Sequence, residues 1–501
     1  MSQVSAQRLS RLTGALPGAE VRGEGDPLVR GIAYDSRSLR PGELFVAVPG
    51  CVTDGHLFLR EAAERGAAAL VVEREAEGLG PGPPPRVRVP SSREALARLA
   101  GAFYGRPSGR LRLVGVTGTN GKTTTTFLLK SILRAAGREA GLIGTIEYHV
   151  GERRLPARRT TPEAPDLQGL LWEMAEAGAS DCVLEVSSHS LELGRVQGCE
   201  FRLGVFTNLT QDHLDFHADV ERYFAAKLRL FTELGAEEAV ANLDDPYGRR
   251  VLAAARGRAL SYGLSPEAPV RPEDVRVGAE GLSFRLLHPG GEVGLRSPLT
   301  GHHNVSNILA AAAAALALGV GEEEMARGVA ALAAVPGRFE KVDRGQPFLV
   351  VVDYAHTEDA LRRVLANARE LTRGRLLTVM GCGGDRDRTK RPRMGRAAAE
   401  LSDLVFITSD NPRSEDPGAI VREVEEGVRG TPGADHRVEV DRRRAIARAV
   451  GEAGEGDTVL LAGKGHETYQ VLEDRTIPFD DREEARRALA ARGFGSTEPS
   501  A

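Results

Sequence analysis

Long apolar runs, cysteines and an excess of charge of one sign are all scarce in this chain, and each scarcity excludes a class of protein. No run of about eighteen apolar residues occurs in its 501 residues, so no membrane-spanning helix is expected. Lys and Arg number 66 against 70 Asp and Glu, a net charge of −4, and the basic residues are spread rather than clustered. This pattern argues against a nucleic-acid surface. We therefore expect a protein that neither inserts into a membrane nor binds nucleic acid.

The few cysteines indicate the compartment. They have no C-x-x-C spacing, and three lie in or beside apolar or glycine-rich runs, so we expect reduced thiols of a cytoplasmic protein. The N-terminus, MSQVSAQRLSRLTGAL, has the pattern of an amphipathic helix start without a long apolar stretch. The four residues are Cys51, Cys182, Cys199 and Cys382.

The length is too great for one core and predicts several α/β domains. Residues 1–109 alternate short strands with helices, which predicts a small α/β domain. Residues 110–337 repeat apolar strand, loop and helix, the pattern of a central, mostly parallel doubly wound sheet of P-loop type, interrupted by a β-rich piece near 261–300. Residues 338–501 repeat the pattern and predict a Rossmann-like C-terminal domain.

Residues 111–126, LRLVGVTGTNGKTTTT, form the motif around which the chain is organised. An apolar strand breaks into a glycine-rich turn, and an apolar helix follows. Gly118 and Gly121 would turn backbone N–H groups inward, Lys122 would reach terminal phosphates, and the Thr123 hydroxyl would bind Mg²⁺. The glycines are closer than in G-x-x-x-x-G-K-S/T, so the alternative is a tight strand-to-helix turn with an incidental lysine. The order of strand, glycines, Lys-Thr and helix favours the phosphate cradle.

Acidic and imidazole side chains follow later strands. Glu185, after a buried strand, is a candidate ligand for the same Mg²⁺, unless it only caps the next helix. The stretch NLTQDHLDFH allows either a zinc or phosphoesterase site or, more economically beside a nucleotide loop, a magnesium role for His213. Its polar members are Asn208, Asp212, His213, Asp215 and His217.

Two further residues remain ambiguous from their pattern alone. Lys227 lies in the helical stretch YFAAKLRLF, where a lone lysine is normally solvated. Asn304, in GHHNVSN, starts an alanine-rich helix and would either cap it or bind an adenine edge; the cap is favoured.

The third domain carries polar loops after its strands: DYAH, GGDRDRTKR, DNPR and GKGHE. Loops that offer both carboxylates and guanidinium groups suit a zwitterionic ligand, since arginine grips a carboxylate and acids receive an ammonium. The alternative for DNPR is a proline turn with an Asx bond.

Taken in order, these motifs closely resemble the Mur ligase family of ATP-dependent amide ligases, which build the peptide stem of peptidoglycan. The resemblance covers nearly the whole chain, and a dozen motifs in order are specific where each alone is weak. The motifs are DSR, GTNGKTT, TTP, EVSSH, TNLTQDHLDFH, YFAAK, GHHNVSN, PGRFE, DYAH, GCGGDRDRTKRP, DNPR and GKGHE. The DNPR motif makes the chain most similar to members that use meso-2,6-diaminopimelate.

The resemblance implies a role for individual residues. Lys122, Glu185, His213 and Lys227 would be catalytic, with Lys227 carbamylated and a metal ligand beside Thr123, Glu185 and His213. ATP would be bound by Gly118, Thr119, Asn120, Gly121, Lys122, Thr123, Thr124, Asn304, Arg338, Asp353 and His356. The UDP-linked substrate would meet Ser36, Thr160, Thr161, Ser187 and Arg195. Diaminopimelate would meet Arg386, Asp410, Asn411, Pro412, Arg413, Gly463 and Glu467. Leu193 stands where some members have a glutamine, which puts that substrate contact in doubt.

The implied reaction joins meso-2,6-diaminopimelate to the D-glutamate of UDP-N-acetylmuramoyl-L-alanyl-D-glutamate, with ATP, Mg²⁺ and an acyl-phosphate intermediate, in a monomeric cytoplasmic enzyme that supports cell shape and division. Alternatives are the same ligase with L-lysine, a folylpolyglutamate-type ligase, a P-loop kinase or motor NTPase that makes no amide bond, and a non-catalytic nucleotide-binding regulator. DNPR and the N-terminal DSR motif disfavour the folylpolyglutamate type, and Lys122, Glu185 and His213 disfavour the regulator.

Overall fold

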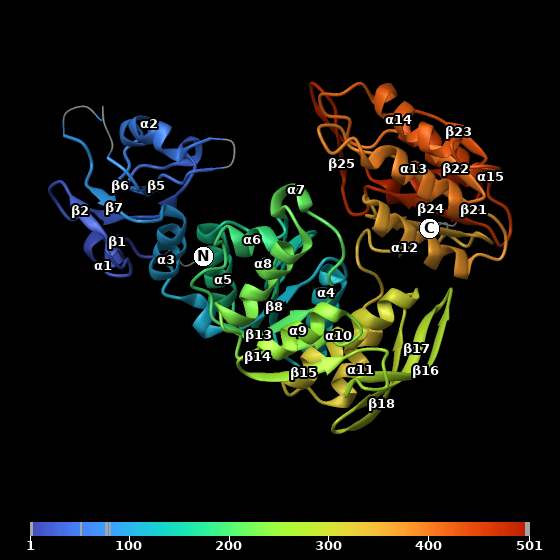
Figure 1. The fold of residues 1–501 in the computed structure, drawn as a ribbon, viewed down its shortest axis with the longest axis horizontal. Helices are drawn as coiled ribbons and strands as arrows, with labels where there is room; N and C mark the ends of the chain where they lie inside the picture. Colours follow the sequence, from blue (N-terminus) through green and yellow to red (C-terminus); the bar gives the residue numbers. More distant parts are fainter. Residues whose placement is uncertain (1–3, 51–52, 76–78, 80–81, 496–501) are drawn as a thin grey trace, which may run out of the picture. The chain divides into compact units, whose positions relative to one another are not determined.

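The structure is a computed structural model that describes residues 4–50, 53–75, 79 and 82–495 (Figure 1). It confirms an α/β chain with mostly parallel sheets. The chain divides into two compact units, which are described separately. Unit 1 comprises Met1–Asp274, Phe284–Leu295 and Val305–Ala331, and unit 2 comprises Val275–Ser283, Arg296–Asn304 and Leu332–Ala501. The three-domain boundaries at 109 and 337 stay a prediction.

Unit 1 begins with a five-stranded sheet in the order β2-β7-β6-β5-β4. Its inner strands are parallel and β2 is antiparallel to β7. The strands are β2 (Glu20–Arg22), β4 (Ile32–Ala33), β5 (Leu44–Val46), β6 (Ala69–Val72) and β7 (Arg86–Arg88), with a small ladder of β1 (Gln7–Arg8) and β3 (Leu28–Val29). The helices are α1 (Leu9–Thr13), α2 (Leu59–Glu64) and α3 (Ser92–Phe103), with 3₁₀ turns η1 (Ser36–Ser38), η2 (Gly55–Phe58) and η3 (Pro107–Arg110).

The N-terminal helix is shorter than its pattern predicts. Helix α1 has five residues, because Gln7 and Arg8 are extended and pair with Val29 and Leu28. Tertiary strand pairing here outweighs local helix propensity.

The central sheet of unit 1 has eight strands in the order β11-β10-β9-β12-β8-β13-β14-β15. The six neighbouring strands β9, β12, β8, β13, β14 and β15 are parallel. Strands β10 and β11 add an antiparallel edge beside β9. Its strands are β8 (Arg112–Thr117), β9 (Ala140–Ile143), β10 (Glu147–Val150), β11 (Arg153–Pro156), β12 (Asp181–Glu185), β13 (Phe201–Phe206), β14 (Glu238–Asn242) and β15 (Arg258–Tyr262). The helices are α4 (Lys122–Ala135), α5 (Ala164–Glu176), α6 (Ser188–Glu192), α7 (Leu214–His217), α8 (Val220–Thr232), α9 (Pro246–Ala254), α10 (His302–Ala317) and α11 (Glu322–Ala331).

The register of this sheet brings the polar strand ends together. Glu185 pairs with Val116, and Phe206 pairs with Thr117. Because the carboxyl ends of β12, β8 and β13 meet at one edge, the loops that follow them share that edge. The predicted β-rich interruption is a three-stranded sheet of β16 (Arg271–Gly278), β17 (Gly281–His288) and β18 (Gly291–Ser297).

Unit 2 contains a six-stranded sheet in the order β19-β20-β24-β21-β22-β23, parallel except for the β19 edge. The strands are β19 (Glu340–Lys341), β20 (Leu349–Asp353), β21 (Leu376–Met380), β22 (Leu404–Ile407), β23 (His436–Val438) and β24 (Thr458–Ala462), with a hairpin of β25 (Tyr469–Val471) and β26 (Thr476–Pro478). The helices are α12 (Glu358–Leu371), α13 (Lys390–Leu401), α14 (Pro417–Arg429), α15 (Arg442–Glu452) and α16 (Asp481–Ala491).

Short polar side chains start many of these helices. Each accepts a hydrogen bond from a backbone N–H of the first turn, which satisfies a donor that the helix itself cannot pair. Such caps include Ser91 on α3, Ser187 on α6, Asp219 on α8, Thr357 on α12 and Asp416 on α14.

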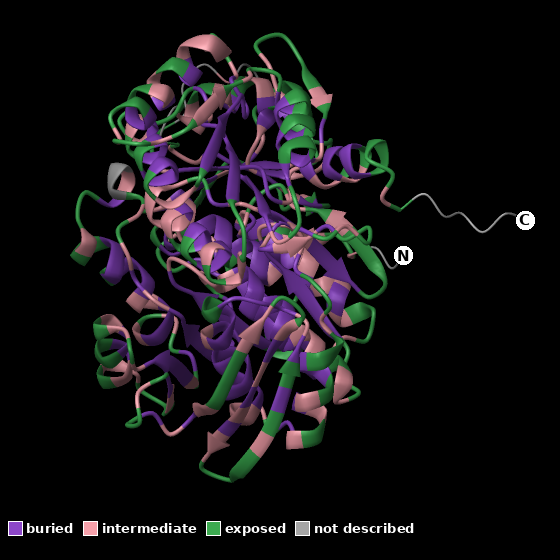
Figure 2. Cartoon of the chain, turned by 90° about the vertical axis from the view of Figure 1, so that its right-hand side faces the viewer, coloured by how far each residue is buried: buried purple, intermediate pink, exposed green. Residues whose placement is uncertain are grey.

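Buried residues concentrate in the sheet strands (Figure 2). Cys182, Cys199 and Cys382 are free and buried, as expected, and burial raises the pKa of the Cys199 and Cys382 thiols to about 12. Cys51 lies outside the described residues. No helix among the described residues is both long and apolar enough to cross a membrane.

A buried ion pair supports the carboxyl end of β24. Arg442 Nε donates to Asp481 Oδ1 (2.8 Å), and Nη2 donates to Asp481 Oδ2 (2.6 Å) and to the Ala462 carbonyl (3.0 Å). Arg442→Ala should destabilise the protein by about 3–5 kcal/mol, because Asp481 would be left buried without its partner. The measurement is denaturant unfolding. Arg444→Ala, on an exposed face of the same helix, should leave the midpoint nearly unchanged; equal midpoints for both variants would contradict the prediction.

Candidate active site

The glycine-rich turn after β8 has a backbone that only glycine tolerates at two positions. Gly118 has φ +146°, and a Cβ there would lie 1.9 Å from Thr207 Oγ1. Gly121 has φ +84°, and its Cβ would lie 2.4 Å from Asn307 Oδ1. Helix α4 then begins at Lys122, so the turn delivers its backbone to a helix N-terminus, where anions are favoured.

The side chains of the turn are held in place around it. Lys122 Nζ donates to the carbonyl oxygens of Gly118 (3.0 Å) and Thr119 (2.8 Å), so the amine folds back over the turn. The Asn120 N–H donates to Asn208 Oδ1 (2.9 Å), and Thr124 is buried in the first turn of α4. Lys122 therefore lies over the glycine-rich turn, and its contact with a phosphate stays a prediction.

Glu185 and Thr123 lie together, as predicted. The Thr123 hydroxyl donates to Glu185 Oε2 (3.0 Å), and the N–H and hydroxyl of Thr145 donate to Glu185 Oε1 (2.8 Å) and Oε2 (3.0 Å). Glu185 is fully buried, yet no cationic side chain lies within 4 Å of it in the described part of the chain. A carboxylate buried without a counter-charge suits a bound cation, and oxygen donors of this kind suit Mg²⁺. Glu185 does not cap α6, since Ser187 does.

Lys227 is not a solvated surface residue. It is 1% exposed, its Nζ donates to the Gly118 carbonyl (2.8 Å), and the amine lies 4.5 Å from the ring centroid of Tyr223. Burial, followed by the charge of Lys122, holds its pKa well below the usual lysine value, although Asp212 opposes the shift. A helix that begins about a hundred residues downstream therefore delivers an amine to the same cradle.

His213 lies in the loop after β13, with φ +53°. Its ring centroid is 4.8 Å from that of His189 and 6.1 Å from that of Tyr223, the ring that also contacts Lys227. His217 is buried and hydrogen-bonds Ser188 Oγ (2.9 Å). Asp215 belongs to this stretch, but its side chain lies outside those described. Among the described side chains, no three His, Cys, Asp or Glu form a metal-ligand group, so the zinc or phosphoesterase alternative gains no support.

The residues expected to line the UDP-substrate path gather around Thr161. The Thr161 hydroxyl donates to the Glu185 carbonyl (2.7 Å), and the Ser187 N–H donates to that hydroxyl (3.1 Å). Arg195 Nη1 donates to the Thr161 carbonyl (3.3 Å). The Thr160 and Thr145 hydroxyls are hydrogen-bonded at 3.1 Å, which joins this group to Glu185. Ser36 lies apart from this set on η1, where its hydroxyl donates to Glu61 (3.0 Å).

In unit 2, three of the expected nucleotide-binding residues surround Tyr354. The guanidinium of Arg338 lies 4.8 Å from the Tyr354 ring centroid, and the His356 ring lies 4.6 Å from it. Asp353 accepts from the N–H groups of Phe339 and Ala355 (both 2.8 Å), and burial raises the pKa of its carboxyl. Asn304 is not the predicted N-cap. Helix α10 begins at His302, and the Asn304 amide donates to the Thr300 carbonyl (2.8 Å) from inside the first turn.

The DNPR and GKGHE loops meet at a buried lysine. Lys464 Nζ donates to Asn411 Oδ1 and to Glu467 Oε2 (both 3.2 Å) and lies 3.6 Å from Asp410 Oδ1. Asp410 Oδ1 is itself buried without a hydrogen bond among the described residues. Gly463 has φ +114°, and a Cβ there would lie 3.0 Å from Asp410 Oδ2. Asp410 Oδ1 is thus a buried acceptor whose near neighbour is the Lys464 ammonium.

Two arginines lie near the same loops. Arg413, with φ +53°, follows Pro412; its Nη1 donates to the carbonyls of Gly384 (2.7 Å) and Asn411 (3.4 Å). A Cβ on Gly383 would lie 2.9 Å from Arg413 Nη1 and 3.9 Å from Arg386 Cγ, so both side chains border this glycine. The alternative for DNPR was a proline turn with an Asx bond. The Asn411 side chain makes no such bond, because its Oδ1 accepts from the Val471 N–H instead of from an N–H of its own turn.

Comparison with known proteins identifies the family. Three family models match in succession: the Mur ligase family catalytic domain over residues 28–104, the Mur ligase middle domain over 116–315, and the Mur ligase glutamate ligase domain over 337–465. The chain belongs to the Mur ligase family. This assignment confirms the resemblance found in the motifs.

The relatives of this Mur ligase match over nearly their whole length. A UDP-N-acetylmuramoyl-L-alanyl-D-glutamate–2,6-diaminopimelate ligase of Solibacter usitatus is 54% identical, covering 94% of this chain and 95% of that protein. The protein of the same description from Gloeobacter violaceus is 49% identical, covering 97% and 99%.

Solved structures agree on the fold of the Mur ligase. One of a UDP-N-acetylmuramoyl-L-alanyl-D-glutamate–2,6-diaminopimelate ligase is 34% identical, with a TM-score of 0.69, covering 98% of this chain and all of that one. A crystal structure of MurF ligase from Thermotoga maritima in complex with ADP has a TM-score of 0.62 at 21% identity, covering 93% and 99%. At that identity the second likeness concerns the fold alone.

Three residues of the Mur ligase site were not predicted from the sequence. Thr145 orients Glu185, Tyr223 packs on Lys227, and Lys464 joins two loops. Lys464 is the one with a usable signal, since a lysine between two glycines after an apolar strand repeats the composition of the cradle. Thr145 and Tyr223 carry no pattern of their own, because only the tertiary structure places them.

Proposed function

We propose that this Mur ligase joins meso-2,6-diaminopimelate to the D-glutamate side-chain carboxylate of UDP-N-acetylmuramoyl-L-alanyl-D-glutamate in the cytoplasm. ATP is converted to ADP and phosphate, and the product is a peptidoglycan precursor. The names of the near full-length relatives support the two substrates. The α/β architecture and the glycine cradle support the nucleotide.

The observation that carries the proposal is the convergence of three groups on one turn. The Thr123 hydroxyl donates to a carboxylate that has no counter-charge among the described side chains, and the buried Lys227 donates to the carbonyl of Gly118 in that turn. A kinase would need the cradle and an acid, but a buried amine beside them, whose burial lowers its pKa, has no use in a plain P-loop site. Carbamylation turns that amine into an anion able to bind a metal ion.

Mg²⁺ fits this donor set. Thr123, Glu185 and His213 would hold one ion, and carbamylated Lys227 would hold a second beside His213, with phosphate oxygens completing both shells. When bound, it supplies positive charge to the phosphate oxygens as negative charge develops on them.

In the first step the D-glutamate carboxylate attacks the γ-phosphorus of ATP, and the bond to the ADP oxygen breaks. This yields an acyl phosphate and ADP. Lys122 and the N-terminus of α4 stabilise the charge that grows on the transferred phosphoryl group. The backbone of Gly118, Thr119, Asn120, Gly121 and Thr124 orients it, and Asn304, Arg338, Asp353 and His356 bind the rest of the nucleotide.

In the second step a neutral amine attacks the acyl carbon, the amide bond forms and phosphate leaves. The amine's proton is released to a carboxylate or phosphate oxygen. Asp410, Asn411 and Glu467 hold the amino acid through its ammonium groups, in keeping with the unsatisfied Asp410 Oδ1, while Arg386, Pro412, Arg413 and Gly463 shape the carboxylate end. Ser36, Thr160, Thr161, Ser187 and Arg195 bind the UDP-linked substrate.

The test is an assay of phosphate release with each substrate omitted in turn. Release should require both UDP-N-acetylmuramoyl-L-alanyl-D-glutamate and an amine, and meso-2,6-diaminopimelate should exceed L-lysine. Release with ATP alone would favour a kinase or motor NTPase. Amide formation on a folate instead of the muramoyl dipeptide would favour the folylpolyglutamate alternative.

Arg413 is expected to select the amino acid. Diaminopimelate differs from lysine by a second carboxylate, and a planar guanidinium binds a carboxylate through two parallel hydrogen bonds. One nitrogen of Arg413 is held by backbone carbonyls, which fixes the group in the loop. Arg413→Ala should raise the KM for diaminopimelate about a hundredfold and abolish discrimination against lysine, because lysine would leave this half-buried guanidinium without a carboxylate partner and diaminopimelate would not.

The control is Arg422→Ala, an exposed arginine on α14 whose nearest acid is Asp416 at 3.5 Å. It should leave KM and selectivity unchanged. Full selectivity in Arg413→Ala, or equal use of both amino acids by the wild type, would make the DNPR loop a turn without a recognition role. Selectivity lost only in Arg386→Ala would transfer the role to that residue.

A further inference from the structure

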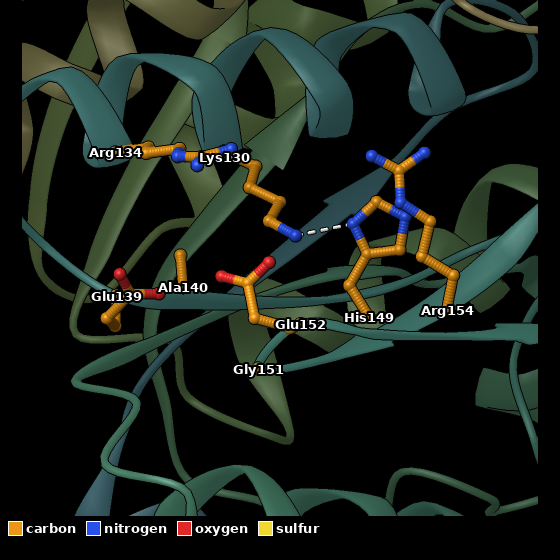
Figure 3. Close-up of a pocket in the computed structure, with 8 residues that line it drawn as sticks. All are labelled: Lys130, Arg134, Glu139, Ala140, His149, Gly151, Glu152 and Arg154. Atoms are coloured by element: carbon orange, nitrogen blue, oxygen red, sulfur yellow. Dashed lines mark hydrogen bonds between the residues drawn. The ribbon is translucent and has the colours of Figure 1, made fainter.

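A second basic pocket lies on unit 1, at the far end of the helix that starts at the cradle. Lys130 is two turns after Lys122 on α4, and its amine reaches toward the β10–β11 hairpin (Figure 3). The cavity has a volume of about 50 Å³. It is lined by Lys130, Arg134, Glu139, Ala140, His149, Gly151, Glu152 and Arg154.

The hydrogen-bond partner of the Lys130 amine is another base. Its Nζ hydrogen-bonds His149 Nδ1, and His149 Nε2 lies 2.6 Å from Glu147 Oε1. A carboxylate accepts, so Nε2 carries the imidazole proton and Nδ1 is left as the acceptor for the Lys130 amine. His149 is buried, with its ring edge-on to Phe127. No carboxylate lies within 4 Å of the Lys130 amine among the described residues.

Two guanidinium groups border the same amine, and only Arg154 has an acid within ion-pair distance among the described residues. Arg134 is exposed and forms neither a hydrogen bond nor an ion pair through its side chain within the described chain. The nearest acid of Arg154 is Glu147, at 3.8 Å, which is beyond hydrogen-bond distance. Figure 3 shows Arg154 and His149 among the residues that line this pocket. Burial, followed by the charges of Arg154 and Arg134, lowers the pKa of Lys130 to about 8.

We propose that this pocket binds a small oxyanion of the sulfate or phosphate class, held by the Lys130 amine and the guanidinium groups of Arg134 and Arg154. The three cationic groups outnumber the two carboxylates that line the same cavity, and within the described residues the central amine hydrogen-bonds only a base, so the lining can attract an anion. Each guanidinium can donate two N–H hydrogen bonds to the oxygens of a tetrahedral oxyanion, and the Lys130 ammonium adds a compact positive charge. The site is distinct from the cradle and does not depend on the proposed function.

The acids that line the cavity limit the size of the anion and its affinity. Glu139 and Glu152 line the same cavity, and neither carboxylate is paired among the described residues. Glu147 hydrogen-bonds His149. The charge of Lys130 also lowers the pKa of the buried Cys182 thiol on β12, although burial raises that pKa more. The acids would repel a larger anion, so a single small dianion is the expected occupant. Glu152→Gln should therefore bind it several-fold more tightly.

Binding should take up a proton. The free Lys130 amine is about half protonated near pH 8, and a bound dianion favours the ammonium, which raises its pKa again. Binding near pH 8 should thus absorb up to about half a proton, and near pH 6 almost none, because Lys130 is already charged. Affinity should fall as the pH rises from about 7 to 9.

Sulfate is the probe, because it carries a constant charge over this pH range and any proton must go to the protein. Calorimetry on the full chain, in the Lys122→Ala background that disables the cradle, should find one site with a Kd of about 1 mM or tighter. Lys130→Gln and Arg134→Ala should each weaken it about tenfold or more. Arg153→Ala is the matched control, because Arg153 neighbours Arg154 on β11 but pairs with Glu173 (2.7 Å); it should change nothing.

Proton uptake separates this site from general charge attraction. Titrations in buffers of different ionisation enthalpy should show uptake at pH 8 in the Lys122→Ala background, and Lys130→Arg should keep binding but lose the uptake. The proposal is overturned by the absence of sulfate binding, by binding that Lys130→Gln and Arg134→Ala leave unchanged, or by uptake that persists in Lys130→Arg. Inorganic phosphate run in parallel tells whether the site also takes that anion.

Discussion

Replacing Lys122 with alanine is expected to reduce ADP formation by about 10²–10³-fold or more at saturating substrates. The ammonium lies over the turn that ends in Gly121, and removing it takes away charge stabilisation that operates when negative charge grows on the transferred phosphoryl group. Loss of one donor of this kind typically costs a few kcal/mol of transition-state stability. Because Lys122 bonds backbone carbonyls of its own turn, the fold should persist.

The measurement is single-turnover ADP formation, with the melting temperature as a check of folding. Arg256→Ala, an exposed cation of unit 1, should keep wild-type rates. Near-normal ADP formation in Lys122→Ala would mean that the glycine turn is structural and that the phosphates are bound elsewhere.

Replacing Lys227 with alanine should abolish activity, and a short-chain carboxylate should partly restore it. The amine is buried beside Lys122, which disfavours its ammonium form. A neutral amine attacks CO₂: the nitrogen bonds to the carbon, an electron pair moves onto oxygen, and the nitrogen releases a proton. The resulting carbamate carries negative charge where a metal ion can bind, whereas an ammonium would repel that ion.

Two observations test this modification directly. Enzyme supplied with ¹³C-bicarbonate should show a carbamate signal that disappears in Lys227→Ala, and crystallographic density should extend beyond Nζ. Lys227→Arg is the control, since a guanidinium cannot form the carbamate and should block rescue by filling the space. A bare ammonium in active, bicarbonate-supplied enzyme would refute the modification.

The sequence predicts much of the fold correctly. The strand, turn and helix from 111 to 126 are β8, the cradle and α4, because apolar strand patterning, glycines and helix formers agree at each position. The polar residues that follow the strands lie at one edge of the sheet, because parallel strands all end at the same edge. The N-terminal helix is present but shorter than predicted, because the pairing of Arg8 with Leu28 is a long-range contact that no local pattern reveals.

The sequence by itself determined the family, the order of the α/β elements and the residue types of the cradle, since these depend on local patterning and on motifs that occur in a fixed order. Only the tertiary structure decided which lone side chains matter. Lys227 had the pattern of a solvated lysine and received a role only from the family resemblance, Lys464 had no role of its own within the GKGHE motif, and Lys130 was not singled out. Their burial and their partners come from strands and loops far away in the chain. Desolvation and Coulomb interactions depend on distance in space rather than in sequence, and that is the physical reason why local patterning does not show the burial and the partners of these three lysines.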